Sequence, residues 1–156
     1  MFTGANDTEF KQAKFFSGGG GLVSTAADYF RFTEMLRRGG ELDGTRILEP
    51  ETVALMTRDH LPDIVPLVKD GVNERSILRR GRGFGLGFDV VVDVANRRGS
   101  ASVGDYSWSG IAGTFFWIDP ALDIVAMGMI QVLRSPLRLS FEMKNLVHES
   151  LINDEN

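Results

Sequence analysis

Residues 105–120, with the sequence DYSWSGIAGTFFWIDP, constrain the fold of this chain more than any other segment. Both tryptophans of the chain lie here, and small residues between them allow the backbone to bend sharply. The pattern predicts a loop that leads into a strand at about residues 113–118 and closes in an Asp-Pro turn. The next run, residues 124–132, is apolar at both alternating sets of positions, which is typical of a central strand covered on both faces. We therefore expect these segments to be antiparallel neighbours in one sheet.

Residues 84–94 carry the clearest alternation in the chain, because apolar side chains occupy every second position. This period predicts one strand over the whole segment. Asp89 and Asp93 lie on the polar side of that strand, where we expect them to face solvent. The preceding residues 60–82 show no period and contain two prolines, so a long loop is expected there.

Capping residues and apolar periodicity predict three helices. The first begins at Ser24 or Thr25 and ends before Gly39-Gly40, and the second begins at Pro50. The third begins at Pro136. The expected inward faces of the first and second helices comprise Tyr29, Phe32, Thr33 and Leu36, and Val53 and Met56, respectively. The expected buried stripe of the third comprises Leu139, Met143, Leu146, Val147 and Leu151.

These elements predict an α+β fold, because the strands follow one another without βαβ alternation and a terminal helix remains to pack on the antiparallel sheet. A chain of 156 residues is the size of one domain. Residues 1–14 are polar and aperiodic, and we interpret them as an irregular lead-in.

The composition argues against several classes of function. A net charge of −4 without a basic patch argues against nucleic-acid binding, and no apolar run is long enough to span a bilayer. The absence of cysteine excludes disulfides and thiolate metal sites. His60 and His148 lack metal-ligand spacing, so we expect ordinary surface or packing roles for them, no metal and no cofactor. Asp119 and Asp123 flank a turn, and Asp119 is interpreted as the turn residue before a proline.

Three segments occur in order along the chain: GGGGLVSTAADYFRF at 18–32, FGLGFDV at 84–90 and WSGIAGTFFWIDP at 108–120. Followed by an apolar strand and a C-terminal helix, they resemble the C-terminal part of the serine β-lactamase and penicillin-binding-protein-like family. The likeness is greatest to the class C β-lactamase-like branch, which includes the family VIII carboxylesterases, and it covers about residues 15–150. The resemblance implies a β-lactamase/DD-peptidase-like fold and a serine hydrolase that works through an acyl-enzyme intermediate.

In that family a Ser-x-x-Lys motif supplies the nucleophile and base, a Tyr-x-Asn or similar box supplies a further acid or base, and a Lys-Thr-Gly triplet lines the third side of the cleft. Trp108-Ser109-Gly110 stands where Lys-Thr-Gly would be. The resemblance therefore implies that Trp108, Ser109 and Gly110 bind substrate. By the same match, the backbone N–H of Ile111 donates to the oxyanion that forms in the tetrahedral intermediate.

Two departures from the family pattern bear on function. Trp108 replaces a cation suited to substrate carboxylates with an apolar indole, which favours esters with apolar acyl groups. The chain contains neither Ser-x-x-Lys nor Tyr-x-Asn, and its nearest match, residues 76–79, ends in an arginine that cannot act as a base. A serine nucleophile needs an activating base. We therefore expect residues 15–156 to be the C-terminal portion of a hydrolase domain without its nucleophile half, and the chain alone to be inactive.

Other interpretations stay open at this point. They are a β-lactamase or D-aminopeptidase/DD-peptidase of the same fold, a non-catalytic relative that binds peptides or cell-wall fragments, and a self-contained interaction module. The expected partners are a small-molecule ester or amide and either the missing N-terminal half or a second copy of the chain, because a fragment would expose an apolar face. The lack of cysteine fits the cytoplasm and the periplasm equally, and any signal peptide is expected in the missing half.

Overall fold

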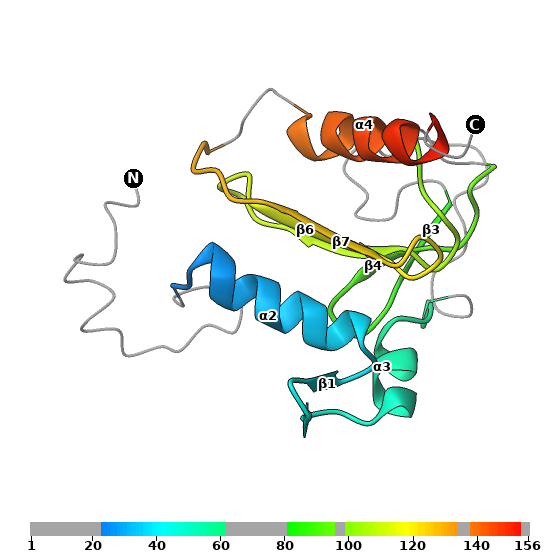
Figure 1. Cartoon of the computed structure of the whole chain (residues 1–156). Helices are drawn as coiled ribbons and strands as arrows, with labels where there is room; N and C mark the ends of the chain where they lie inside the picture. Colours follow the sequence, from blue (N-terminus) through cyan, green and yellow to red (C-terminus); the bar gives the residue numbers. More distant parts are fainter. Residues whose placement is uncertain (1–22, 62–80, 96–98, 134–137, 154–156) are drawn as a thin grey trace.

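The fold is a five-stranded antiparallel sheet with helices on both faces (Figure 1). The computed structural model describes residues 23–61, 81–95, 99–133 and 138–153, so the expected lead-in and the expected helix start at Pro136 lie outside the described residues. The elements are α2 (Ala26–Arg37), β1 (Glu41–Leu42), β2 (Thr45–Arg46), α3 (Pro50–Met56), β3 (Arg82–Phe84), β4 (Asp89–Val91), β5 (Tyr106–Ser109), β6 (Phe115–Asp119), β7 (Ile124–Gly128) and α4 (Leu139–Asn153). Strands β3 to β7 are neighbours in chain order, and β1 and β2 form a separate hairpin. The expected α+β architecture with a terminal helix on the sheet is confirmed.

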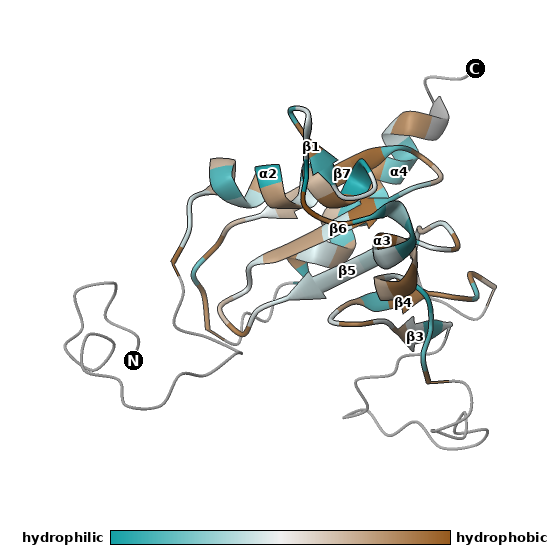
Figure 2. Ribbon diagram, turned by 90° about the horizontal axis from the view of Figure 1, so that it is seen from below, coloured by the Kyte–Doolittle hydropathy of each residue, from teal (hydrophilic) through white to brown (hydrophobic). Residues whose placement is uncertain are grey.

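The main core lies between the sheet and the helices α2 and α3. Figure 1 shows these helices on the side of the sheet opposite α4, and Figure 2 views the molecule from their side. Tyr106, Phe116 and Ile118 project from β5 and β6 into this core, and Ile118 has no exposed surface. They meet Leu36 of α2 and Val53 of α3, which are also buried. The alternation along β6 explains this arrangement, because successive strand residues point to opposite faces of a sheet. None of the described helices combines the length and the apolarity needed to cross a membrane.

Helix α2 begins and ends as expected. Thr25 is its N-cap, and its hydroxyl accepts a hydrogen bond from the Asp28 N–H at 3.1 Å. Gly39 and Gly40 follow the helix with φ of +66° and +96°, a region that favours glycine. The predicted inward face was wrong at Phe32, which is 40% exposed at the flank of the helix. The remaining inward residues of α2 and α3 are buried or pack against the core as predicted.

The predicted strand over residues 84–94 was wrong, because the chain forms the hairpin β3–β4 there. Gly87 has φ of +96°, and the Gly85 N–H donates to the Phe88 carbonyl at 2.8 Å across the turn. Phe88 is buried, whereas Leu86 at the turn is 51% exposed. Gly85 and Gly87, which fitted the alternation of a single strand, instead form the tight turn between the two strands.

Two further expectations about the sheet were wrong. Strand β5 was expected to be loop, yet it pairs with β6 along its whole length. Strand β7 was expected to be central, but within the described residues it pairs only with β6 and lies at the edge of the sheet. Its residues are all half-buried, because α2 contacts it on one side. The apolar pattern of a strand indicates which of its faces are covered. It does not indicate which strands form hydrogen bonds with its backbone.

The predicted buried stripe of α4 was wrong at its three leucines, whereas Met143 and Val147 are half-buried. Leu139 and Leu146 are 38% and 65% exposed, and Leu151 is 37% exposed. Lys144 and His148 are buried in their place, at 5% and 6% exposure. The helix turns its two basic side chains toward the sheet because buried carboxylates lie beneath them there.

Candidate functional site

The residues predicted to bind substrate lie at the end of β5, which we name the β5 edge and define as Trp108, Ser109, Gly110 and Ile111. Strand β4 pairs with β5 only at Tyr106 and Ser107, so in the described part of the chain Trp108 and Ser109 run past the end of β4. Both remain paired with β6 on their other side. The β5 edge therefore combines a fixed backbone with one side that a ligand can approach.

A tight turn follows the β5 edge and exposes Ile111. The Gly110 N–H donates to the Thr114 carbonyl at 2.8 Å, and the Gly113 N–H donates to the Gly110 carbonyl at 3.0 Å. Gly113 has φ of +88°, and a Cβ on Gly110 would lie 2.7 Å from the Thr114 hydroxyl. Ile111 is 72% exposed, and among the described residues its N–H has no backbone acceptor. The geometry thus leaves a backbone donor at the tip of a constrained turn.

Trp108 of the β5 edge packs against a second aromatic residue, Phe84 of β3, which the sequence did not place at the site. Its ring is 5.5 Å from the Phe84 ring, centre to centre, at an interplanar angle of 78°. This edge-to-face arrangement is a favourable one for aromatic pairs. Trp108 remains 44% exposed, and Phe84 is half-buried. The pair forms a partly open aromatic surface beside the small residues Ser109 and Gly110.

Asp59 and His60, just after α3, fix the position of Phe84. The Phe84 N–H donates to Asp59 Oδ1 at 3.0 Å, and the Phe84 carbonyl accepts from the His60 N–H at 2.9 Å. The same Asp59 oxygen accepts from the Leu61 N–H at 3.0 Å. A Cβ on Gly83 would lie 2.2 Å from the Asp59 carboxyl carbon, so glycine makes room for this contact. Asp59 is 25 residues from Phe84 in sequence, and no local pattern signals such a pairing.

Both tyrosines lie in or against the core and away from the β5 edge. Burial raises the pKa of Tyr106 far above its ordinary value, and burial also raises the pKa of Tyr29. The two rings belong to the core, where Tyr106 contacts Phe88 and Tyr29 contacts Phe116. Within the described residues, then, no phenol lies on the β5 edge.

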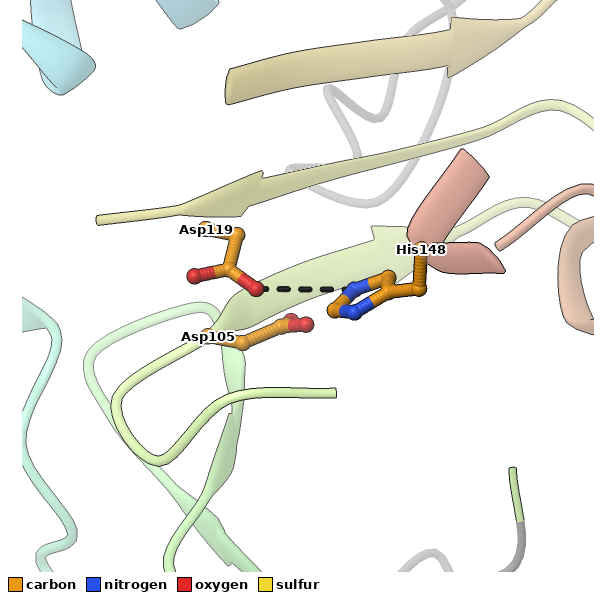
Figure 3. Close-up of side chains that lie close together, drawn as sticks. All are labelled: Asp105, Asp119 and His148. Atoms are coloured by element: carbon orange, nitrogen blue, oxygen red, sulfur yellow. Dashed lines mark ion pairs between the residues drawn. The ribbon is translucent and has the colours of Figure 1, made fainter. Parts of the chain in front are cut away.

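A second group of polar residues lies on the opposite face of the sheet, between α4 and the ends of β5 and β6. Asp105, Asp119 and His148 are buried, and their ligand-type atoms all lie within 4.8 Å of one another (Figure 3). The Lys144 ammonium already forms an ion pair with Asp105. A divalent cation would have to displace that ammonium, so the arrangement fits an internal set of ion pairs better than a metal centre.

The sequence predicted part of this second group. Asp119 is the turn residue, as expected, because its Oδ1 accepts from the Ala121 and Leu122 N–H groups at 3.0 and 3.2 Å. Its other oxygen lies 3.5 Å from His148 Nε2. His148 has a packing role, as expected, because its imidazole is buried against the Asp119 carboxylate. The spacing of Lys144 and His148, four residues apart on one helix face, was the available signal.

The other carboxylates that were considered do not form a site. Asp89 pairs with Arg82 and is partly buried, so the expected solvent-facing role was wrong. Asp93 accepts from the Ala95 N–H at 2.9 Å, and Asp123 pairs with Arg37. Asp89 thus links β3 to β4, Asp93 stabilises its own turn, and Asp123 links the turn after β6 to α2.

Comparison with known proteins gives the following likenesses. A family model described as Beta-lactamase matches residues 2–140. Protein Rv1367c of Mycobacterium tuberculosis is 42% identical over 124 residues, which cover 75% of this chain and 29% of that protein. The chain thus spans less than a third of the length of this curated relative.

Two solved structures share the fold. One is EstCE1, a hydrolase with promiscuous acyltransferase activity, at 26% identity and a TM-score of 0.58, covering 82% of this chain and 30% of EstCE1. The other is the simvastatin synthase LovD from Aspergillus terreus, at 20% identity and a TM-score of 0.66, covering 87% of this chain and 36% of LovD. Both likenesses are to beta-lactamase-type folds and confirm the fold expected from the sequence.

Proposed function

This chain belongs to the beta-lactamase family, and from that premise we propose that it forms one side of a serine-hydrolase cleft that cleaves carboxylic esters. The observation that carries the proposal is the β5 edge, where Trp108-Ser109-Gly110 runs past the end of β4 into an exposed turn. A substrate acyl group would lie along Ser109 and Gly110, whose side chains leave the strand backbone open. The Ser109 hydroxyl would donate a hydrogen bond to a substrate oxygen.

In this proposal the N–H of Ile111 is one of the oxyanion donors. Such a donor matters because negative charge develops on the carbonyl oxygen only as the tetrahedral intermediate forms. The two hydrogen bonds that close the turn at Gly110 and Gly113 support this role, since they fix the direction of the donor before substrate arrives. Loss of one such donor costs about 3 kcal/mol of barrier in comparable hydrolases.

The aromatic pair Trp108 and Phe84 supports an ester with an apolar acyl group over a β-lactam or a peptide. Both of those alternatives offer a carboxylate, for which a lysine would provide a cation, whereas the indole and phenyl rings offer apolar surface. EstCE1, one of the solved structures with this fold, is itself described as a hydrolase with acyltransferase activity, which fits acyl transfer at such a site.

We further propose that these 156 residues are inactive alone. They contain no Ser-x-x-Lys, so the nucleophile and the base have to come from another segment, either of a longer polypeptide or of a second chain. The exposed leucines of α4 support a partner of this kind, because they leave an apolar surface on the helix.

A hybrid protein tests the proposal. This chain replaces the matching 124 residues of Protein Rv1367c, and the hybrid, the unmodified relative and the chain alone are assayed with p-nitrophenyl butyrate and with a chromogenic cephalosporin. We expect the hybrid and the relative to hydrolyse the ester, a serine-directed phosphonate to stop them, and the chain alone to release no nitrophenol.

Three results would contradict the proposal. Faster turnover of the cephalosporin than of the ester by the hybrid would favour a β-lactamase. Hydrolysis of neither substrate by the hybrid and the relative would favour a non-catalytic binding protein. Phosphonate-sensitive turnover by the chain alone would show that it holds its own nucleophile.

A further inference from the structure

Phe84 lies next to the β5 edge, and residues outside the β3–β4 hairpin bind both of its backbone polar groups. Its N–H donates to Asp59 Oδ1 at 3.0 Å, and its carbonyl accepts from the His60 N–H at 2.9 Å. Its ring meets the Trp108 ring edge to face. The residues after α3 therefore determine where one of the two rings beside the β5 edge lies.

The Asp59 carboxylate is held in place by contacts other than the one with Phe84. Its Oδ1 also accepts from the Leu61 N–H at 3.0 Å, which is the local turn that an aspartate forms with the residue two positions on. The neighbouring His60 ring lies 2.7 Å from the Leu55 carbonyl of α3 through its Nε2. The carboxylate is thus fixed relative to α3, and Phe84 is the group that it positions.

Two glycines let the β3–β4 hairpin come this close to the end of α3. A Cβ on Gly83 would lie 2.2 Å from the Asp59 carboxyl carbon, and a Cβ on Gly85 would lie 2.1 Å from the Met56 carbonyl oxygen. Both distances are far below a van der Waals contact. Any larger residue at either position would push β3 away from α3, so the close approach belongs to the residues that flank Phe84 on each side.

We propose that Asp59 is a positioning residue for acyl selection, a role that rests on the esterase function proposed above. It holds the Phe84 ring beside Trp108, and the two rings form the surface on which acyl chains longer than acetyl lie. Trp108 is 44% exposed and Phe84 is half-buried, so the pair offers apolar surface to the methylenes of such a chain. An acetyl group has only its methyl group to place there.

The expected effect is a change in the preference for acyl length. Complete burial of one methylene in the transition state raises kcat/KM about fourfold, and partly open rings provide about half of that free energy, which gives about twofold per methylene. Butyrate has two methylenes more than acetate, so the rings should favour the butyrate ester about fourfold. Release of Phe84 removes one of the two rings and should lower this preference to about twofold.

The ratio of kcat/KM for p-nitrophenyl butyrate and p-nitrophenyl acetate is measured in the hybrid protein and its variants. Loss of stability alone leaves this ratio unchanged, because both substrates report on the same folded molecules. Asp59→Ala and Phe84→Ala should lower the ratio equally, and the double variant should lower it no further, because Asp59 acts through Phe84. Asp59→Asn keeps an acceptor oxygen and should retain the ratio of the parent.

Acrylamide quenching of tryptophan fluorescence in the 156-residue chain tests the positioning step without any activity. Trp108 is 44% exposed and Trp117 is 2% exposed, so quenching of the folded chain reports mainly on Trp108. Asp59→Ala should raise the quenching constant toward that of Phe84→Ala, and Asp59→Asn should leave it at the parent value. If Asp59→Ala does not fold, Asp59→Ser takes its place in both measurements, because a serine hydroxyl forms the same local turn but ends one bond short of Phe84.

A ratio that stays at the parent value when Asp59 is replaced by alanine would overturn the assignment. A further loss in the double variant, or an unchanged quenching constant in Asp59→Ala, would do the same. Failure of the proposed function looks different, because the hybrid and Protein Rv1367c would then hydrolyse neither ester. Acyl selection would fall with it, and the quenching series would still decide whether Asp59 positions Phe84.

Discussion

Replacement of Gly83 by alanine tests how the aromatic surface of the β5 edge is held in place. The new Cβ would lie 2.2 Å from the Asp59 carboxyl carbon and 2.5 and 2.6 Å from its two oxygens. No real Cβ comes so close, so the carboxylate has to leave. It would then lose both of its hydrogen bonds, one from the Phe84 N–H and one from the Leu61 N–H.

The structure gives the expected size of this effect. A hydrogen bond to a charged group contributes about 1.5–3 kcal/mol, and partial exposure places these two at the lower end. Gly83→Ala should therefore lower the free energy of unfolding by about 3 kcal/mol. Asp59→Ala removes the same two bonds and should cost about the same. The double variant should also cost about 3 kcal/mol, because the Cβ added at position 83 then meets no carboxylate.

Urea unfolding of the parent chain, the two single variants and the double variant measures this coupling. Asp59→Asn is the matched control, because it keeps an acceptor oxygen at the same position and should cost less than Asp59→Ala. Single-variant costs that add in the double variant to within about 0.5 kcal/mol would refute the reasoning. So would a Gly83→Ala chain as stable as the parent.

Three further predictions concern the pH response, the core and the substrate. The hydrogen bond from Arg37 lowers the pKa of Glu34 from 4.5 to about 2, so the stability from this carboxylate is present above pH 4.5 and is lost as pH falls through about 2. Urea unfolding between pH 2 and pH 6 should therefore show a weaker acid dependence for Glu34→Gln than for the parent, and equal slopes would contradict the pairing. Ile118→Ala removes a fully buried side chain and should cost about 4 kcal/mol, whereas Leu146→Ala, at 65% exposure, should stay within about 0.5 kcal/mol; similar losses in the two would place Leu146 in the core after all. In the hybrid protein, Trp108→Lys should tighten cephalosporin binding about tenfold, as one charge-assisted hydrogen bond of about 1.5 kcal/mol would, and should slow ester turnover. An unchanged ratio of the two substrates would show that Trp108 does not select the substrate.

Local chemistry explains which elements could be predicted. Thr25 caps α2 and Pro50 opens α3 because their effects act within one helical turn. Asp119 forms its turn through its own neighbours two and three residues on. The resemblance of the ordered segments to the serine β-lactamase-like family is likewise borne out by the family model and the solved structures. These features depend on contacts between residues close in sequence or on the order of residues, and both can be recognised in a sequence.

The elements that were mispredicted depend on contacts between distant residues. Residues 84–94 alternate like one strand, yet the glycines form a turn once Phe84 is bound by Asp59 and Leu86 by the Met56 carbonyl. Within the described ranges β7 pairs with β6 alone, and side-chain periodicity does not encode which backbones pair.

The sequence by itself determined the fold class, the two ends of α2, the start of α3 and the turn at Asp119. Only the tertiary structure decided that Phe84 stands against Trp108 and that α4 buries Lys144 and His148 instead of its leucines. The physical reason is that a charged side chain is buried only where a partner compensates its charge. Asp105 and Asp119 lie at two strand ends, and only the folded sheet brings them under one face of the helix.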